Sequence, residues 1–247
     1  MIRSSARMVL SILAGLLVLG CVDTTSYQYL ATEKGLDQFK AGDYATAAGS
    51  FTDALRHEPR YYRAEYYLAA CHDELKMHQQ AVSEYKATLQ IMNTTSQGRR
   101  DKAFRYQVID ALAQSIARGS DVDSQIAQLQ SQSSVNSAEN YYLLAKVYQY
   151  AQDADSAITA YEKATLLDPS NAKYAGDYGL FLNRIGQTGK AEQQLRKAQS
   201  LGNKDQQITD ALRQMGSVAG ASTAQPAEPS EPKTPGNTPT ATAGPRD

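Results

Sequence analysis

The sequence predicts an all-α protein made of stacked helical hairpins, and three observations support this fold class. Residues 40–59 (KAGDYATAAGSFTDALRHEP) and 150–169 (YAQDADSAITAYEKATLLDP) share a sparse pattern, with five identical positions at a separation of 110 residues. β-Branched residues form no alternating runs, which argues against strands. Apart from the six prolines in 226–245, the chain has only Pro59 and Pro169, which end the repeated segments and interrupt no predicted helix.

Composition and charge restrict the classes of function. The 247 residues carry 25 Lys and Arg against 26 Asp and Glu, a formal net charge of −1. Without the first 20 residues, which hold Arg3 and Arg7, the balance is 23 basic against 26 acidic side chains. Nucleic-acid-binding proteins concentrate positive charge on one face or in basic runs. We therefore expect no nucleic-acid partner.

The N-terminal segment has the parts of a bacterial export signal. Arg3 and Arg7 give a positive start, and Met8–Leu19 is an uncharged apolar run too short to span a bilayer as a stable helix. The run ends in Val18-Leu19-Gly20-Cys21, which resembles the lipobox of bacterial lipoproteins. An ordinary secretory leader followed by a coincidental cysteine is the alternative.

The lipobox resemblance implies cleavage before Cys21 and covalent lipid on that residue. In that family the cysteine carries a diacylglycerol thioether, and its new amino group is acylated, typically with palmitate. Residues 1–20 are then a signal peptide and 21–27 a lipidated tether. Two or more acyl chains hold a protein stably on a membrane, so we expect a membrane anchor and no cofactor besides this lipid. Val22 rather than Asp after the cysteine favours a periplasm-facing lipoprotein of the outer membrane.

The repeated segments resemble the second half of a tetratricopeptide repeat (TPR). This 34-residue helix–turn–helix unit has small residues where its helices cross and a proline near its end. With Pro59 and Pro169 at position 32, four units span 28–61, 62–95, 138–171 and 172–205. The crossing positions 8 and 20 of these units hold only Gly or Ala, namely Gly35, Ala47, Ala69, Ala81, Ala145, Ala157, Gly179 and Ala191. Small residues allow antiparallel helices to approach within about 8–10 Å. The resemblance thus implies an all-α TPR superhelical solenoid.

The segments between and after these units complete the expected organisation. Stepping back one period from residue 138 gives 104–137, which has helical stripes of apolar residues but Asp123 at position 20. We therefore expect about five helix–turn–helix repeats, the middle one degenerate, and a capping helix. The expected parts are TPR 1–2 (28–95), a loop and degenerate repeat (96–137), TPR 4–5 (138–205), the capping helix (206–216) and a disordered Pro/Thr/Ala-rich tail (217–247).

No catalytic or metal-binding pattern is complete. Gly186–Lys190 is half of a phosphate-binding loop, but Arg184 and Ala191 stand where the full pattern needs Gly and Ser or Thr. The pair Cys71-His72 lacks further ligands at the spacing of a metal site. We expect no metal and no enzymatic activity.

TPR arrays bind partner segments in a concave groove lined by the first helix of each unit. By this resemblance, the partner-binding candidates are Phe39, Lys40, Tyr66, Asp73, Tyr142, Lys146, Tyr150, Asn183 and Arg184. The Lys and Asn with which chaperone-binding TPRs clamp a carboxylate are absent at the matching positions. Tyrosine offers a rigid apolar surface with a polar group, so we expect Tyr66, Tyr142 and Tyr150 to be exposed for a protein partner.

The lipobox and the repeats together resemble TPR lipoproteins of pilus and secretion systems, namely TadD-type assembly proteins of the Flp/Tad pilus and PilF-type pilotins. This resemblance implies an outer-membrane scaffold whose groove holds a secretin or pilus-assembly subunit. NlpI-like adaptors, which dock periplasmic cell-wall hydrolases or proteases, are the alternative.

Overall fold

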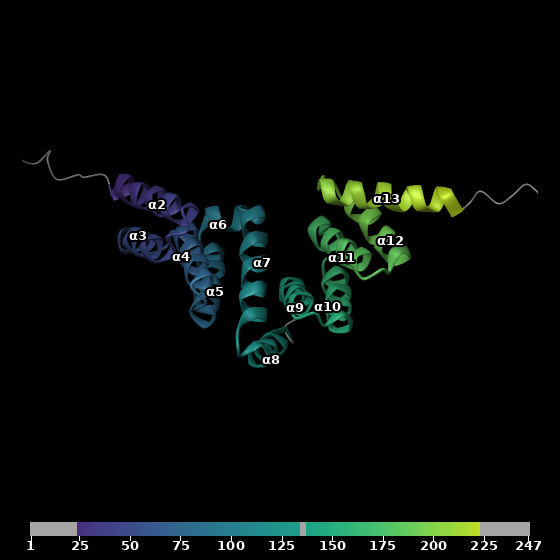
Figure 1. Ribbon diagram of the computed structural model, residues 1–247, viewed down its shortest axis with the longest axis horizontal. Coiled ribbons are helices and arrows are strands. Elements are labelled where there is room, and N and C mark those ends of the chain that lie inside the picture. Colours follow the sequence, from purple (N-terminus) through teal and green to yellow (C-terminus); the bar gives the residue numbers. More distant parts are fainter. Residues whose placement is uncertain (1–23, 134–136, 223–247) are drawn as a thin grey trace, which may run out of the picture.

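The computed structural model describes residues 24–133 and 137–222, and all regular structure in this part of the chain is helical. The helices are α2 (Thr24–Lys40), α3 (Tyr44–His57), α4 (Tyr62–Glu74), α5 (His78–Thr94), α6 (Ser96–Arg100), α7 (Lys102–Arg118), α8 (Val122–Ser133), α9 (Ala138–Tyr150), α10 (Ala154–Leu167), α11 (Ala172–Arg184), α12 (Thr188–Ser200) and α13 (Gln206–Ser222). They follow one another along an arc, with α2 and α13 toward its opposite ends (Figure 1). The predicted all-α solenoid of stacked hairpins is confirmed.

The signal peptide at 1–20, the lipidated Cys21 and residues 223–247 of the predicted 217–247 tail lie outside the described residues. The predicted tether of 21–27 is shorter than expected, because α2 begins at Thr24. None of the helices between residues 24 and 222 combines the length and the apolar character that crossing a membrane requires.

The repeated sequence pattern marks the second helix of two hairpins, α3 and α10. Asp43 caps α3 by accepting a hydrogen bond from the backbone N–H of Thr46 at 3.2 Å. Asp153 caps α10 in the same way, from Ser156 at 3.1 Å. Four residues after each cap, an alanine with no exposed surface lies where the hairpin's two helices cross. The shared residues therefore determine the start and the close packing of the same element in two hairpins.

Two glycines allow the helices of a hairpin to approach closely. A Cβ atom on Gly35 would lie 2.8 Å from the ring of Phe51, and one on Gly179 would lie 2.7 Å from Cγ and Cδ2 of Leu195. The Cβ atom on Gly179 would also lie 3.0 Å from the backbone nitrogen of Leu195, so the two helices would have to separate to remove the clash. The small residues predicted at position 8 are thus required by the packing of α2 on α3 and of α11 on α12.

Substituting Gly179 by alanine is expected to lower the free energy of unfolding by roughly 1–3 kcal/mol, because the added methyl group overpacks the crossing. Gly49→Ala is the matched control, since a Cβ there meets nothing within 4 Å. It is expected to raise the free energy of unfolding by roughly 0.5–1 kcal/mol, the helical preference of Ala over Gly. Urea denaturation of both variants tests this, and a Gly179→Ala protein as stable as the wild type contradicts the close crossing.

The middle hairpin, α7 and α8, is the irregular one. Helix α8 packs more on α9 than on α7, and among its described side chains only Leu129 is buried. Asp123 occupies the crossing position that is Ala in the other hairpins, and a carboxylate is costly to bury in such a contact. The short helix α6 occupies part of the predicted loop. Helix α7 contacts both α5 and α9 and so connects the two halves of the array.

The last helix covers the C-terminal end of the array and is longer than predicted. Ile208 and Ala211 of α13 are buried in a cluster with Leu195 and Ala198 of α12. Helix α13 continues to Ser222 instead of ending at residue 216. Residues 217–222 (SVAGAS) contain Ala and no Pro, whereas the first proline of the tail is at 226, so nothing in this stretch stops the helix.

Aromatic side chains form much of the packing between successive hairpins. The rings of Tyr142 and Tyr174 stack with centroids 4.5 Å apart, and those of Tyr161 and Tyr178 stack at 5.4 Å. All four are at most 4% exposed. Tyrosine therefore serves largely as core in this array, joining α9 and α10 to α11.

Candidate binding groove

The first helices of the hairpins line two hollows that meet on α7. The larger, of about 660 Å³, lies among α7, α9, α11 and the start of α13. The smaller, of about 480 Å³, lies among α2, α4, α5 and α7. Gln107 and Asp110 border both hollows. We call the two together the groove, and its C-terminal and N-terminal halves are the larger and the smaller hollow.

The structure brings seven of the nine predicted partner-binding residues into the groove. Tyr142, Lys146, Tyr150 and Arg184 line the C-terminal half, and Phe39, Tyr66 and Asp73 line the N-terminal half.

Lys40 and Asn183 line neither half of the groove. Lys40 is exposed and lies 3.6 Å from Asp37 on its own helix. Lys40 follows the groove residue Phe39, and Asn183 precedes the groove residue Arg184. Adjacent side chains on a helix point about 100° apart, so these two point away from the groove face. Both were predicted to contact a partner in the groove, and the residues that line its two halves give that prediction no support.

The predicted exposure of three tyrosines is also wrong. Tyr142 is only 1% exposed, because its ring is covered by Tyr174 of the next hairpin. Tyr66 is half-buried between Tyr85 and Phe104, whose ring centroids lie 5.6 and 5.0 Å away. Tyr150 is half-buried as well. Rings of the same hairpin (Tyr85) and of the following first helices (Phe104 and Tyr174) cover Tyr66 and Tyr142.

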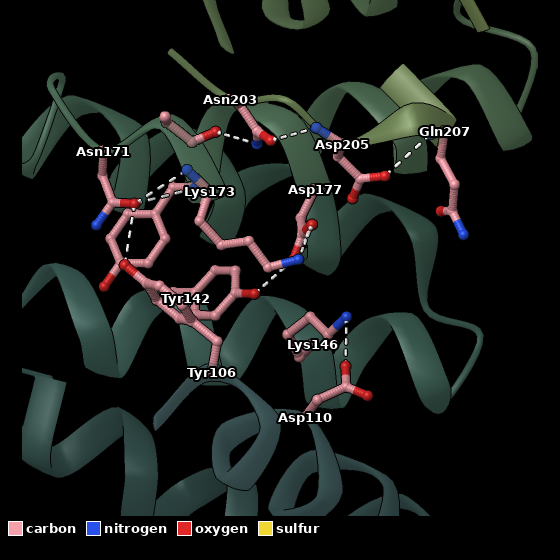
Figure 2. A network of polar contacts seen from close by, with 12 residues as sticks. Tyr106, Asp110, Tyr142, Lys146, Asn171, Lys173, Asp177, Asn203, Asp205 and Gln207 are labelled. Atoms are coloured by element: carbon pink, nitrogen blue, oxygen red, sulfur yellow. Dashed lines mark hydrogen bonds and ion pairs between the residues drawn. The ribbon is translucent and has the colours of Figure 1, made fainter. Parts of the chain in front are cut away.

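Four charged groups of the C-terminal half, those of Asp110, Lys146, Lys173 and Asp177, form two ion pairs within the protein (Figure 2). The Lys146 ammonium lies 2.5 Å from Asp110 Oδ1, and the Lys173 ammonium lies 2.7 Å from Asp177 Oδ1. Tyr142 donates its hydroxyl hydrogen to Asp177 Oδ2 at 2.5 Å. These contacts connect α7 to α9 and α9 to α11 beneath the surface that a partner would touch.

Asp110 is the centre of the pairing between α7 and α9. The Tyr150 hydroxyl donates to its Oδ1 at 2.8 Å, and Gln114 donates to Oδ2 at 2.9 Å. Burial alone would raise the pKa of Asp110, but the charge and hydrogen bond of Lys146, with those of Tyr150 and Gln114, outweigh it and hold this pKa below its ordinary value. Asp110 is therefore a carboxylate at neutral pH.

Polar contacts also attach the start of α13 to the groove. Asn203 donates from its side-chain amide to the backbone carbonyl of Ala172 at 3.0 Å, and its own amide oxygen accepts from the Asp205 backbone N–H at 3.0 Å (Figure 2). Asp205 and Gln207 thereby border the C-terminal half. The cap thus contributes to the groove as well as covering the core.

Asp73, a predicted partner-binding residue of the N-terminal half, already has two internal partners. His78 Nδ1 donates to its Oδ1 at 2.6 Å, and Arg118 donates to its Oδ2 at 3.0 Å. Its side chain is only 9% exposed. Asp73 therefore holds α4, α5 and α7 together and offers little of its carboxylate to a partner.

Sequence reasoning missed the contribution of α7. The predicted stripe of apolar residues in 104–137, which includes Val108, Leu112 and Ile116, is buried in the core. Other residues of α7 border the groove instead, namely Ala103, Tyr106, Gln107, Asp110, Ala111, Gln114 and Arg118. Asp101, which caps α7 by accepting from the Phe104 N–H at 3.3 Å, is the signal for the correct register.

Metal-ligand groups and the one cysteine of the described residues were the features with possible chemistry in the sequence. No group of three or more His, Cys, Asp or Glu side chains between residues 24 and 222 is placed to hold a metal ion. Cys71 is buried and unbridged, and burial followed by the charge of Glu84 raises its pKa to about 12. A thiol with that pKa is a poor nucleophile at neutral pH.

Two segments match models of known families. Residues 32–92 and residues 138–171 each match a model described as a tetratricopeptide repeat. The fold is a tetratricopeptide-repeat solenoid. This TPR fold is typically a non-catalytic scaffold, and it is suited to protein–protein interaction.

Several solved structures are similar to this chain at low sequence identity, and some of them are described as TPR proteins. A thermophilic TPR protein of Thermus thermophilus is 19% identical, with 78% of this chain and 98% of that chain covered and a TM-score of 0.45. A crystal structure of MamA is 19% identical over 72% of this chain and 92% of that chain, with a TM-score of 0.39. YrrB, a TPR protein with an unusual peptide-binding site, is 14% identical over 74% and 90%, with a TM-score of 0.38. No curated protein matches the chain.

Proposed function

We propose that this protein is a lipid-anchored scaffold that holds an extended segment of a partner protein in the groove. The observation that carries the proposal is the continuity of the groove over α2, α4, α7, α9, α11 and the start of α13. A surface built from the same side of successive hairpins is long and narrow, which suits an extended chain better than a compact ligand.

The chemistry of the groove supports a protein segment as the ligand. Half-buried rings of Phe39, Tyr66, Tyr106 and Tyr150 give apolar area that is fixed in place. Most charged groups below these rings are paired with one another, so they need no counter-charge from the partner. We therefore expect the affinity to depend only weakly on ionic strength, because few unpaired charges contribute to it.

The anchor and the partner class come from the sequence. The lipobox ending at Cys21 supports a covalent lipid and a position on the periplasmic face of the outer membrane. Together with the TPR array, this supports a pilotin-like role in which the groove carries a secretin or pilus-assembly subunit of a Flp/Tad or type IV-like system. The acyl chains then bring the complex to the outer membrane.

Placing a charge in the middle of the groove tests this function. Gln107 is exposed on α7 and borders both halves, so Gln107→Arg puts a long cation where the partner segment must cross. We expect affinity capture of the partner from membranes to fall about tenfold or more, which corresponds to about 1.4 kcal/mol. Mass spectrometry of the captured proteins is expected to identify secretin or pilus-assembly subunits.

Gln90→Arg is the matched control, because Gln90 is exposed on α5 and borders neither half of the groove. It is expected to capture the partner as the wild type does. Equal capture by the two variants contradicts binding in the groove. Recovery of cell-wall amidases or proteases in place of secretin or pilus proteins overturns the pilotin-like role while leaving the scaffold.

A further inference from the structure

We propose that the first turns of α2 dock on the lipid bilayer beside the anchor at Cys21, an inference that rests on the proposed lipidation. Two large side chains there are mostly exposed in the described chain: Tyr29 is 60% exposed and Leu30 is 65% exposed. Later apolar residues of the same helix, Leu36 and Phe39, pack against the first hydrophobic cluster. The exposed apolar surface of α2 is therefore confined to the end nearest the anchor.

The distance from the anchor places this surface at the membrane. Helix α2 begins at Thr24, three positions after Cys21, so a fully extended connection between them reaches at most about 11 Å. Leu30 follows six residues later, about 9 Å along the helix axis. The lipid chains would hold Tyr29 and Leu30 within about 20 Å of the point where the thioether enters the bilayer.

The residue types fit the boundary between headgroups and hydrocarbon. Tyrosine is enriched at this boundary because it has an apolar ring and a polar hydroxyl, and a leucine beside it gains by leaving water. One turn further along, Glu33 and Lys34 are exposed and charged. They limit the buried part to the first turns, so α2 touches the bilayer by its end and does not lie flat in it.

Docking at this end leaves the groove accessible. The α2 residue that borders the groove is Phe39, nine positions after Leu30 and about 14 Å along the axis. The array would thus be held at one end, with α7, α9 and α11 farther along the arc (Figure 1). The anchor would set the orientation of the scaffold as well as its location.

The absence of tryptophan from the chain allows a direct test. Leu30→Trp introduces a single indole at the proposed docking point, in the lipidated full-length protein reconstituted into vesicles of phosphatidylethanolamine and phosphatidylglycerol. Leu166→Trp is the control, since Leu166 is 78% exposed on α10, far along the array. We expect Leu30→Trp to show blue-shifted emission and quenching by brominated acyl chains several-fold stronger than Leu166→Trp, and Tyr29→Trp to behave like Leu30→Trp.

Each other result overturns the proposal in a distinguishable way. If mass spectrometry confirms lipid on Cys21 and the two leucine variants are quenched equally, the docking is wrong and the anchor stands. If Cys21 carries no lipid, the anchor itself is wrong, and the docking falls with it. If the blue shift of Leu30→Trp depends on protein concentration and not on vesicles, a second copy of the chain covers this end of α2.

Discussion

Raising the pH above 10 is expected to unfold the described array in one cooperative step. Among the tyrosines that are at most 4% exposed, five have pKa values raised well above the ordinary value of 10.0, with burial as the first cause in each case: Tyr85, Tyr142, Tyr161, Tyr174 and Tyr178. In the folded protein they stay protonated above pH 10, whereas in the unfolded chain they lose their protons near that pH. The unfolded state then binds fewer protons, so stability falls as the pH rises.

The expected loss is large because the five groups act together. Each contributes about 1.4 kcal/mol per pH unit between its unfolded and folded pKa, which gives about 7 kcal/mol per unit for five. At this slope, a domain with a free energy of unfolding of about 5–15 kcal/mol unfolds within about one to two pH units. Circular dichroism and tyrosinate absorbance, followed in one alkaline titration, are expected to change together.

Tyr178→Phe provides the control for this titration. It removes one titrating hydroxyl and is expected to reduce the alkaline slope by about a fifth, since one of five groups is lost. Tyrosinate absorbance that rises near pH 10 while the helical signal persists would contradict the burial of these side chains.

Replacing Asp110 by leucine is expected to lower the free energy of unfolding by about 3 kcal/mol, because it leaves the Lys146 ammonium without its partner. The Lys146 side chain is 11% exposed and that of Asp110 34%, so water compensates only part of the loss. Tyr150 also loses the acceptor of its hydroxyl hydrogen. Urea denaturation near neutral pH measures the effect.

The double variant Asp110→Leu/Lys146→Met separates the lost pairing from lost packing. Replacing both members of a buried ion pair by apolar groups is often near neutral, so this protein is expected to lie within about 1 kcal/mol of the wild type. The pKa of Asp110 is held below its ordinary 3.8, so the stability from the pair is present above that pH and is lost as the pH falls through the folded pKa. A single variant as stable as the double one would show that the pair is unimportant.

The sequence was sufficient for the fold because the same physical constraint recurs in each hairpin. Gly or Ala at the helix crossings is a local signal that the structure uses as expected, for example at Gly179. In the two hairpins with the repeated segment, Asp43 and Asp153 also cap the second helix. The middle hairpin followed a different spacing. There the cap Asp101 sets the register of α7 two positions earlier than the 34-residue period does, and Val108 of the predicted apolar stripe is fully buried.

The side chains available for binding were harder to predict. Their exposure depends on the side chains of the next hairpin, which the pattern of one repeat does not include. Tyr142, for example, is covered by Tyr174 of the next hairpin. The roles of Lys146 and Asp73 likewise depend on partners more than 35 positions away along the chain, Asp110 and Arg118. A positional rule identified the helix face but not which charges on it were already paired.

Site-specific photo-crosslinking in living cells tests most directly whether the groove is the binding face. A photoreactive amino acid at Gln107, in the middle of the groove, is expected to capture one partner protein through a single extended segment. The same amino acid at Gln90, on the exposed side of α5, is expected to capture none. Crosslinks to the partner from position 90 and none from position 107 would contradict binding in the groove.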